Sequence, residues 1–200
     1  MIALIDFGSQ TAHLIKRRVA DLGVQIEIVE PENTLTFINQ NLVKGLILSG
    51  GPASVYTGGA PTIDPAVFDQ NLPILGICYG WQITAHQLDG QVEQGDKEYG
   101  PALMKLDNNS CLFEDLPNKL KVWMSHGDRV TQLPSGFDYL GETKQLKAAA
   151  VANQDKQIYG LQFHPEVQHT DQSVKILQNF VKKICGLTVS PKKIEVNQVI

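Results

Sequence analysis

The chain has 200 residues, of which 42% are hydrophobic and 19% charged, with a formal net charge of −4, and this allows one folded domain with a full core. The mild acidity and the lack of a Lys/Arg stripe argue against nucleic-acid binding, and no apolar run reaches the ~20 residues of a membrane span. Three cysteines without a Cys-x-x-Cys pair argue against a disulfide framework or a metal site, so we expect a cytoplasmic protein.

The first half of the chain alternates apolar runs with segments of helical spacing. Gly23 is predicted to end the first helix, and Thr34 to cap the second. This alternation predicts the α/β class, with a doubly wound, mostly parallel sheet flanked by helices. The four apolar runs predicted to be strands are Ile2–Asp6, Gln25–Val29, Gly45–Ser49 and Pro73–Ile77.

The second half of the chain has a different sequence pattern, with shorter strand-like segments after Gly90. We expect some of these strands to be antiparallel. A final amphipathic helix is predicted over Gln172–Ile184, ended by Gly186. Its predicted buried stripe is Val174, Leu177, Val181 and Ile184. The predicted strands are 103–106, 122–125, 139–141, 148–152 and 158–163. We assign 1–187 to one domain and 188–200 to an exit segment.

The segment 76–80 (GICYG) follows an apolar strand and precedes a helix. Glycine on both sides of Cys78 permits a tight turn that would lift the side chain out at the carboxyl edge of a sheet. A helix N-terminus beside a cysteine favours the thiolate. Free cysteines are usually packing residues, and we keep that interpretation for Cys111 and Cys185. The two glycines favour a nucleophile at Cys78.

A cysteine nucleophile needs a base and a group that orients the base. His164 and Glu166 lie two residues apart at the end of an apolar run, and Pro165 favours extended backbone at His164. Glu166 could therefore hold the imidazole as the acid of a Ser/His/Asp triad does. Without Cys78, a solvated loop would be the better interpretation of this pair.

An acyl-transfer site also needs donors for the developing oxyanion. The segment 49–52 (SGGP) follows the third apolar run and is predicted to lie at the same sheet edge. Backbone N–H groups of Gly51 and Tyr79 would make a plausible pair of donors. Neither GxxxxGK[ST] nor a GxGxxG after the first strand is present, which argues against a nucleotide-phosphate site.

Together, these motifs resemble class I glutamine amidotransferases, which have a flavodoxin-like fold. The segments 76–82 (GICYGWQ), 49–52 (SGGP) and 164–167 (HPEV) carry this resemblance. The segments 6–10 (DFGSQ), 123–128 (WMSHGD) and 164–170 (HPEVQHT) are similar to the amidotransferase part of GMP synthetase in particular. The resemblance covers about residues 1 to 190.

The resemblance implies hydrolysis of L-glutamine to glutamate and ammonia. Cys78 would form a γ-glutamyl thioester, His164 would be the acid and base, and Glu166 would orient it. Gly51 and Tyr79 would form the oxyanion hole. For His126 and Asp128, positioning or partner contact is favoured over catalysis. The residues implied to bind the substrate are Gln82, Ser125, His126, Gly127 and Asp128.

The resemblance also implies a partner, a synthetase domain or subunit that aminates xanthosine monophosphate with ATP and Mg. No cofactor is expected in this chain, which lacks the Ser-Gly-Gly-x-Asp-Ser loop of that partner, and residues 188–200 are similar to the lead into it. Two positions depart from the family pattern. Trp81 stands where Met is common, and Thr11 stands where a tyrosine often follows the glutamine, which affects packing and local or inter-domain contacts.

Three alternatives remain. An amidotransferase for another synthase, such as that for anthranilate or CTP, is disfavoured by the segments 123–128 and 164–170. A non-catalytic regulatory module with Trp81 filling the pocket is disfavoured because Cys78, His164 and Glu166 are all present. The spacing of His164 and Glu166 also mimics a zinc deaminase, but the Pro-Cys-x-x-Cys half of that motif is missing.

Overall fold

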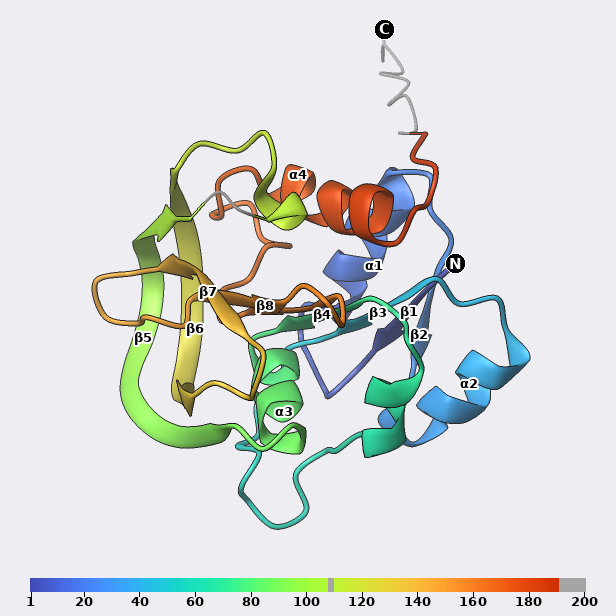
Figure 1. Ribbon diagram of the computed structural model, residues 1–200, viewed down its shortest axis with the longest axis horizontal. Helices are drawn as coiled ribbons and strands as arrows, with labels where there is room; N and C mark the ends of the chain where they lie inside the picture. The colour runs from blue at the N-terminus through green and yellow to red at the C-terminus, as the bar shows by residue number, and fades with distance from the viewer. Residues whose placement is uncertain (108–109, 191–200) are drawn as a thin grey trace, which may run out of the picture.

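The computed structural model describes residues 1–107 and 110–190 (Figure 1). Its nine-stranded sheet has the order β2-β1-β3-β4-β9-β8-β7-β5-β6. The strands are β1 (Ile2–Ile5), β2 (Ile26–Val29), β3 (Gly45–Leu48), β4 (Ile74–Ile77), β5 (Gln91–Leu106), β6 (Lys119–Gln132), β7 (Asp138–Glu142), β8 (Ala150–Asn153) and β9 (Ile158–Leu161).

The sheet has a parallel part and an antiparallel part. β2, β1, β3, β4 and β9 pair in parallel, whereas β9, β8, β7, β5 and β6 pair antiparallel. Every residue of β1, β3, β4 and β9 is buried, because parallel strands are covered on both faces. The predicted α/β class, with antiparallel strands in the second half, is confirmed.

Helices cover both faces of the sheet and divide the core into two layers. α1 and α4 lie on one face and α3 on the other (Figure 1), and each face has its own cluster of buried apolar side chains. The helices are α1 (Ala12–Asp21), α2 (Thr34–Gln40), α3 (Tyr79–Gln87) and α4 (Ser173–Asn179), with 3-10 turns η1 (Pro31–Asn33), η2 (Pro65–Asp69) and η3 (Cys111–Phe113) and a π-helix η4 (Phe180–Ile184).

Three predicted details of these elements are wrong. β5 and β6 are 16 and 14 residues long, longer than the predicted pieces 103–106 and 122–125, and the polar first part of β5 carries no apolar alternation that would predict strand. Val174 is 43% exposed, whereas the other predicted stripe residues, Leu177, Val181 and Ile184, are buried. The residue before α2 is Asn33 rather than Thr34. Gly23 and Gly186 do follow helices, with φ of 78° and 67°.

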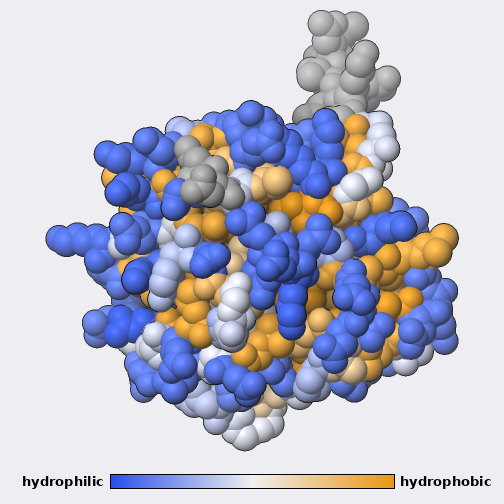
Figure 2. Space-filling view, in the orientation of Figure 1, coloured by the Kyte–Doolittle hydropathy of each residue, from blue (hydrophilic) through white to orange (hydrophobic). Residues whose placement is uncertain are grey.

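The surface in this orientation mixes hydrophilic and apolar residues (Figure 2). Leu42 and Leu103 are among the large apolar side chains that remain exposed. Within residues 1–107 and 110–190, no helix is long and apolar enough to cross a bilayer. The exit segment predicted over 188–200 lies outside the described residues after position 190.

Candidate active site

A pocket of about 550 Å³ lies where four parallel strands end. The loops after β1, β3, β4 and β9 contribute Ser9, Gly51, Cys78 and His164 to its wall. β6 supplies the opposite wall with the segment 125–128. Open α/β sheets place ligands at the carboxyl ends of their strands, and the chain brings its predicted site residues together at that edge.

Cys78 forms the turn between β4 and α3 in a strained backbone conformation, with φ of 52° and ψ of −106°. Such strain concentrates at functional sites and is typical of a nucleophile turn. Glycine is required on both sides of Cys78 because backbone atoms of neighbouring segments lie too close to leave room for a side chain. A Cβ on Gly76 would lie 2.7 Å from the Gly80 carbonyl oxygen, and a Cβ on Gly80 would lie 2.2 Å from that of Leu48. The Cys78 sulfur faces the pocket.

His164 and Glu166 are in direct contact. His164 Nδ1 donates to Glu166 Oε1 over 2.8 Å, since a carboxylate only accepts. Glu166 is fully buried. His164 and Cys78 both line the pocket, and a Cβ on Gly50 would lie 3.2 Å from His164 Cε1 and 3.8 Å from Cys78 Cβ. The structure thus joins the three residues in the order that nucleophilic catalysis requires.

The ionisation of His164 is set by these neighbours. Burial acts to lower the pKa of His164, but hydrogen bonds and charges from Cys78 and Glu166 outweigh it and raise this pKa to about 10. The imidazole is therefore protonated at neutral pH. A neighbouring imidazolium favours the thiolate form of a cysteine, which is the nucleophilic form.

This raised pKa predicts a pH dependence of stability. The free energy of unfolding should fall as the pH rises from about 6.5 to about 10, because the unfolded chain loses the His164 proton in that window while the folded chain keeps it. Urea unfolding at about pH 6, 8 and 10 should show that His164→Asn removes this decline. His13→Asn, at an exposed position, is the matched control. Equal pH slopes for the His164→Asn variant and the unmodified chain would contradict the prediction.

The segment 125–128 is fixed by hydrogen bonds. Gln82 Nε2 donates to the Asp128 carbonyl oxygen over 2.9 Å, and Tyr56 donates to Asp128 Oδ1 over 2.8 Å. His126 Nδ1 lies 3.1 Å from the same carbonyl, so this nitrogen carries a proton. These contacts hold the polar β6 wall in place opposite Cys78.

His126 has a second neighbour, the carboxylate of Glu98. The two side chains approach to 3.2 Å between Nε2 and Oε2, but this geometry is not that of a hydrogen bond. Burial lowers the pKa of His126, although Glu98 opposes this effect. The pKa shift of His126 is therefore opposite in direction to that of His164, because burial outweighs the carboxylate partner at His126 and is outweighed at His164.

Gly51 and Tyr79 lie side by side near the nucleophile. A Cβ on Gly51 would lie 2.8 Å from the Phe7 carbonyl oxygen and 3.3 Å from Tyr79 Cγ. A larger residue at position 51 would therefore push its loop away from Phe7 and Tyr79. Tyr79 is the first residue of α3, where a backbone N–H has no partner within the helix. The geometry is compatible with the two predicted oxyanion donors.

Trp81 lies outside the pocket. Its side chain is fully buried and packs against Phe137, with ring centroids 5.4 Å apart. A Cβ on Gly160 would lie 2.3 Å from the indole, so Gly160 of β9 makes room for the ring. Trp81 therefore fills the core between α3 and the sheet and leaves the space around Cys78 open.

Sequence reasoning missed two polar residues of the site. Gln162 is fully buried; its Nε2 lies 3.6 Å from the Cys78 sulfur, and its Oε1 accepts from Gln82 over 3.3 Å. Thr11 donates to Glu166 Oε1 over 2.7 Å. An amide within the apolar run 158–163 was a usable signal for Gln162, because buried polar groups are kept only with partners.

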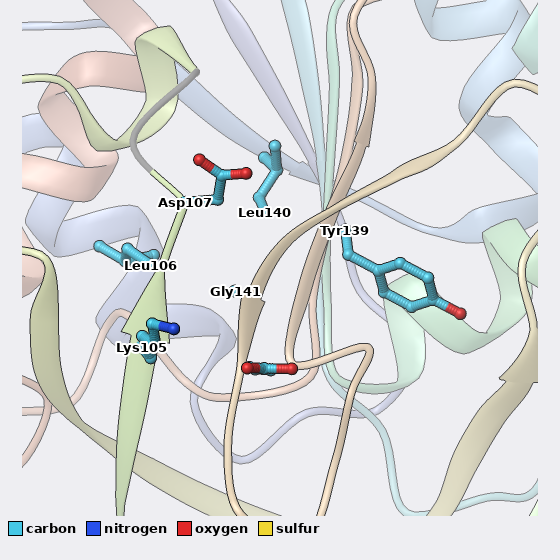
Figure 3. Close-up of a pocket in the computed structure, with 7 residues that line it drawn as sticks. Lys105, Leu106, Asp107, Tyr139, Leu140 and Gly141 are labelled. Carbon is cyan, nitrogen blue, oxygen red and sulfur yellow. The ribbon is translucent and has the colours of Figure 1, made fainter.

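A second pocket, of about 350 Å³, lies between β5 and β7 (Figure 3). Lys105 and Leu106 come from β5, and Tyr139 and Leu140 come from β7. Neither a cysteine nor a histidine is among its lining residues. This pocket therefore lacks the groups for nucleophilic chemistry that surround Cys78.

Comparison with known proteins gives consistent matches. The family model of class I glutamine amidotransferases matches residues 3–184. Proteins named GMP synthase (glutamine-hydrolyzing) are 46% identical over 92% of this chain in Lactobacillus johnsonii and 47% identical over 94% in Nitratiruptor. The chain spans only 36% and 37% of the length of these relatives.

Solved structures agree with this match. A crystal structure described as that of a GMP synthase subunit from Thermoplasma acidophilum superposes with a TM-score of 0.79 at 31% identity, covering 92% of this chain and 93% of the other. A glutamine amidotransferase from Thermotoga maritima, at 20% identity and a TM-score of 0.68, shares the fold over 92% of this chain and 83% of its own. By sequence and by structure, the chain belongs to the class I glutamine amidotransferase family.

Proposed function

We propose that this chain hydrolyses L-glutamine to glutamate and ammonia and supplies the ammonia to a synthetase unit that converts xanthosine monophosphate to GMP with ATP. The observation that carries this proposal is that Cys78 and His164 share one pocket, with the buried Glu166 hydrogen-bonded to His164. The names of the relatives support the GMP-forming partner over another synthase.

In the first step, the Cys78 sulfur attacks the side-chain amide carbon of glutamine. A carbon–sulfur bond forms, the carbon–nitrogen bond breaks, and His164 gives its proton to the leaving nitrogen, which departs as ammonia. The product on the enzyme is a γ-glutamyl thioester. Glu166 keeps the imidazole oriented through the hydrogen bond to Nδ1.

In the second step, water attacks the thioester carbon while His164 takes its proton. The carbon–oxygen bond forms, the carbon–sulfur bond breaks, and glutamate leaves with the cysteine regenerated. Backbone N–H groups of Gly51 and Tyr79 would stabilise the oxyanion in both steps. Removing one such donor typically costs about 10²- to 10³-fold in rate.

The substrate's charged amino-acid head would be held by the fixed β6 wall. Ser125, His126, Gly127 and Asp128 line the pocket together with Gln82. The Asp128 carboxylate offers a partner for the α-ammonium group, and it is buried, which strengthens such a contact. These residues position the substrate and take no part in the bond changes.

The second half-reaction would be carried out by the partner, a synthetase domain or subunit that binds ATP and Mg. We propose a cytoplasmic location, no nucleic-acid or membrane partner, and a role for residues 188–200 in leading toward the synthetase. The relatives include a protein of which this chain covers only 36% of the length and a protein of similar length, of which it covers 93%.

The proposed function is tested by trapping and by reconstitution. Incubation with a diazo-ketone analogue of glutamine should label Cys78, as read by peptide mass analysis. Addition of a GMP-forming synthetase, ATP and xanthosine monophosphate should raise glutaminase activity and produce glutamine-dependent GMP. Label on another residue would overturn the nucleophile assignment. Unchanged activity and no GMP would overturn the coupling, and would favour a partner such as anthranilate or CTP synthase.

A further inference from the structure

Thr11 directs its hydroxyl toward the triad and away from its own helix. It is the residue before α1, yet its side chain makes no capping hydrogen bond to the helix. Threonine at this position normally accepts a hydrogen bond from a backbone N–H of the first turn. Instead, Thr11 Oγ1 lies 2.7 Å from Glu166 Oε1. The residue therefore contacts a partner 155 positions away in the sequence.

The direction of these hydrogen bonds follows from the available protons. Glu166 Oε1 can only accept, so Thr11 gives its one hydroxyl proton to Glu166. The 2.9 Å contact between Ser9 Oγ and Thr11 Oγ1 must then have Ser9 as donor. Ser9 in turn accepts from the Thr11 backbone N–H over 3.1 Å. Ser9 thus orients the Thr11 hydroxyl toward the carboxylate.

Glu166 depends on few donors. Its Oε1 receives the two short hydrogen bonds from His164 and Thr11, while its buried Oε2 has no hydrogen-bond partner in the described part of the chain. A fully buried carboxylate is costly unless donors compensate for lost hydration. Thr11 therefore supplies one of two side-chain donors that hold this charge beside the imidazole.

We propose that Thr11 is a positioning residue of the triad, which holds the Glu166 carboxylate in register with His164 through its hydroxyl. This inference rests on the proposed function, because it gives Glu166 the role of orienting the base. Thr11 lies in the wall of the pocket, but its hydroxyl proton is given to Glu166. It acts on the reaction through Glu166, and its loss should affect turnover more than substrate binding.

The test is a set of variants assayed for glutamine hydrolysis, with and without the synthetase. Thr11→Val keeps the shape and removes the hydroxyl, and it should lower kcat about tenfold at unchanged KM. Thr11→Ser should restore kcat. In a Glu166→Ala background, Thr11→Val should cost nothing further, because the two residues act as one unit. Thr131→Val, at an exposed position of β6, is the control.

A readout independent of turnover is the proton resonance of His164 Nδ1–H, which should shift in Thr11→Val and stay in place in Thr131→Val. Unchanged kcat and an unchanged resonance in Thr11→Val would overturn the inference. An additional tenfold loss in the Glu166→Ala background would also overturn it. Absence of Cys78-dependent hydrolysis in the unmodified chain would instead contradict the proposed function, which the labelling experiment tests separately.

Discussion

Replacing Cys78 with alanine is expected to lower kcat for glutamine hydrolysis by at least about 10⁴-fold, because no other group near the pocket can form the thioester. Glutamate release should be measured with and without the synthetase. Activity with ammonia supplied directly to the reconstituted complex should persist, since the change removes only the source of ammonia. Thermal unfolding should be nearly unaffected.

Cys111→Ala provides the matched control for this experiment. Cys111 is a free, exposed cysteine in η3, and it does not line the pocket around Cys78. Its replacement should leave hydrolysis and labelling by the diazo-ketone unchanged. Substantial hydrolysis by the Cys78→Ala variant would show that a different group attacks the amide, and the proposed mechanism would then be wrong.

Gly80→Ala is expected to cause the largest loss of stability of any single methyl addition near the site. The added Cβ would lie 2.2 Å from the carbonyl oxygen of Leu48 and 2.6 Å from its carbonyl carbon. These are backbone atoms of β3, so α3 would have to move away from the sheet. We expect a cost of about 3 kcal/mol or more in the free energy of unfolding, at the upper end of overpacking effects.

Urea unfolding of purified protein measures this cost, and soluble yield provides a second measure if the variant does not fold. Gly58→Ala is the control, because no atom lies within 4 Å of a Cβ at that position and its φ is not in the left-handed region. Gly58→Ala should change the free energy of unfolding by less than about 1 kcal/mol. A similarly small effect of Gly80→Ala would mean that the β3–α3 contact is looser than the structure shows.

The parallel half of the fold was predictable because its strands are buried on both faces. β1, β3 and β4 appear in the sequence as unbroken apolar runs between helical segments. The β5–β6 ribbon was not predictable in length. Much of β5 is exposed on both sides, so neither apolar alternation nor an apolar run marks where its strand begins.

The site residues likewise differ in how far the sequence alone predicts them. Local signals identified Cys78 and the pair of His164 and Glu166, because the glycines that flank Cys78 and the two-residue spacing of His164 and Glu166 are visible in short segments. Thr11 carries no local signal of function, and the amide of Gln162 within an apolar run indicates only that it has a buried partner. Their contacts bridge 155 and 84 positions, and only the strand order of the sheet brings such residues together.

The place of β9 within the sheet has a consequence for the growing chain. β9 lies between β4 and β8, and the backbone N–H of Cys78 donates to the carbonyl of Leu161 over 2.7 Å. During translation at about 5–20 residues per second, several seconds would pass between the synthesis of the Cys78 turn and that of β9. Such distant pairing also slows folding. We therefore expect the nucleophile to acquire its base only after β9 has been synthesised, so a nascent chain carries Cys78 in an unassembled state before β9 emerges.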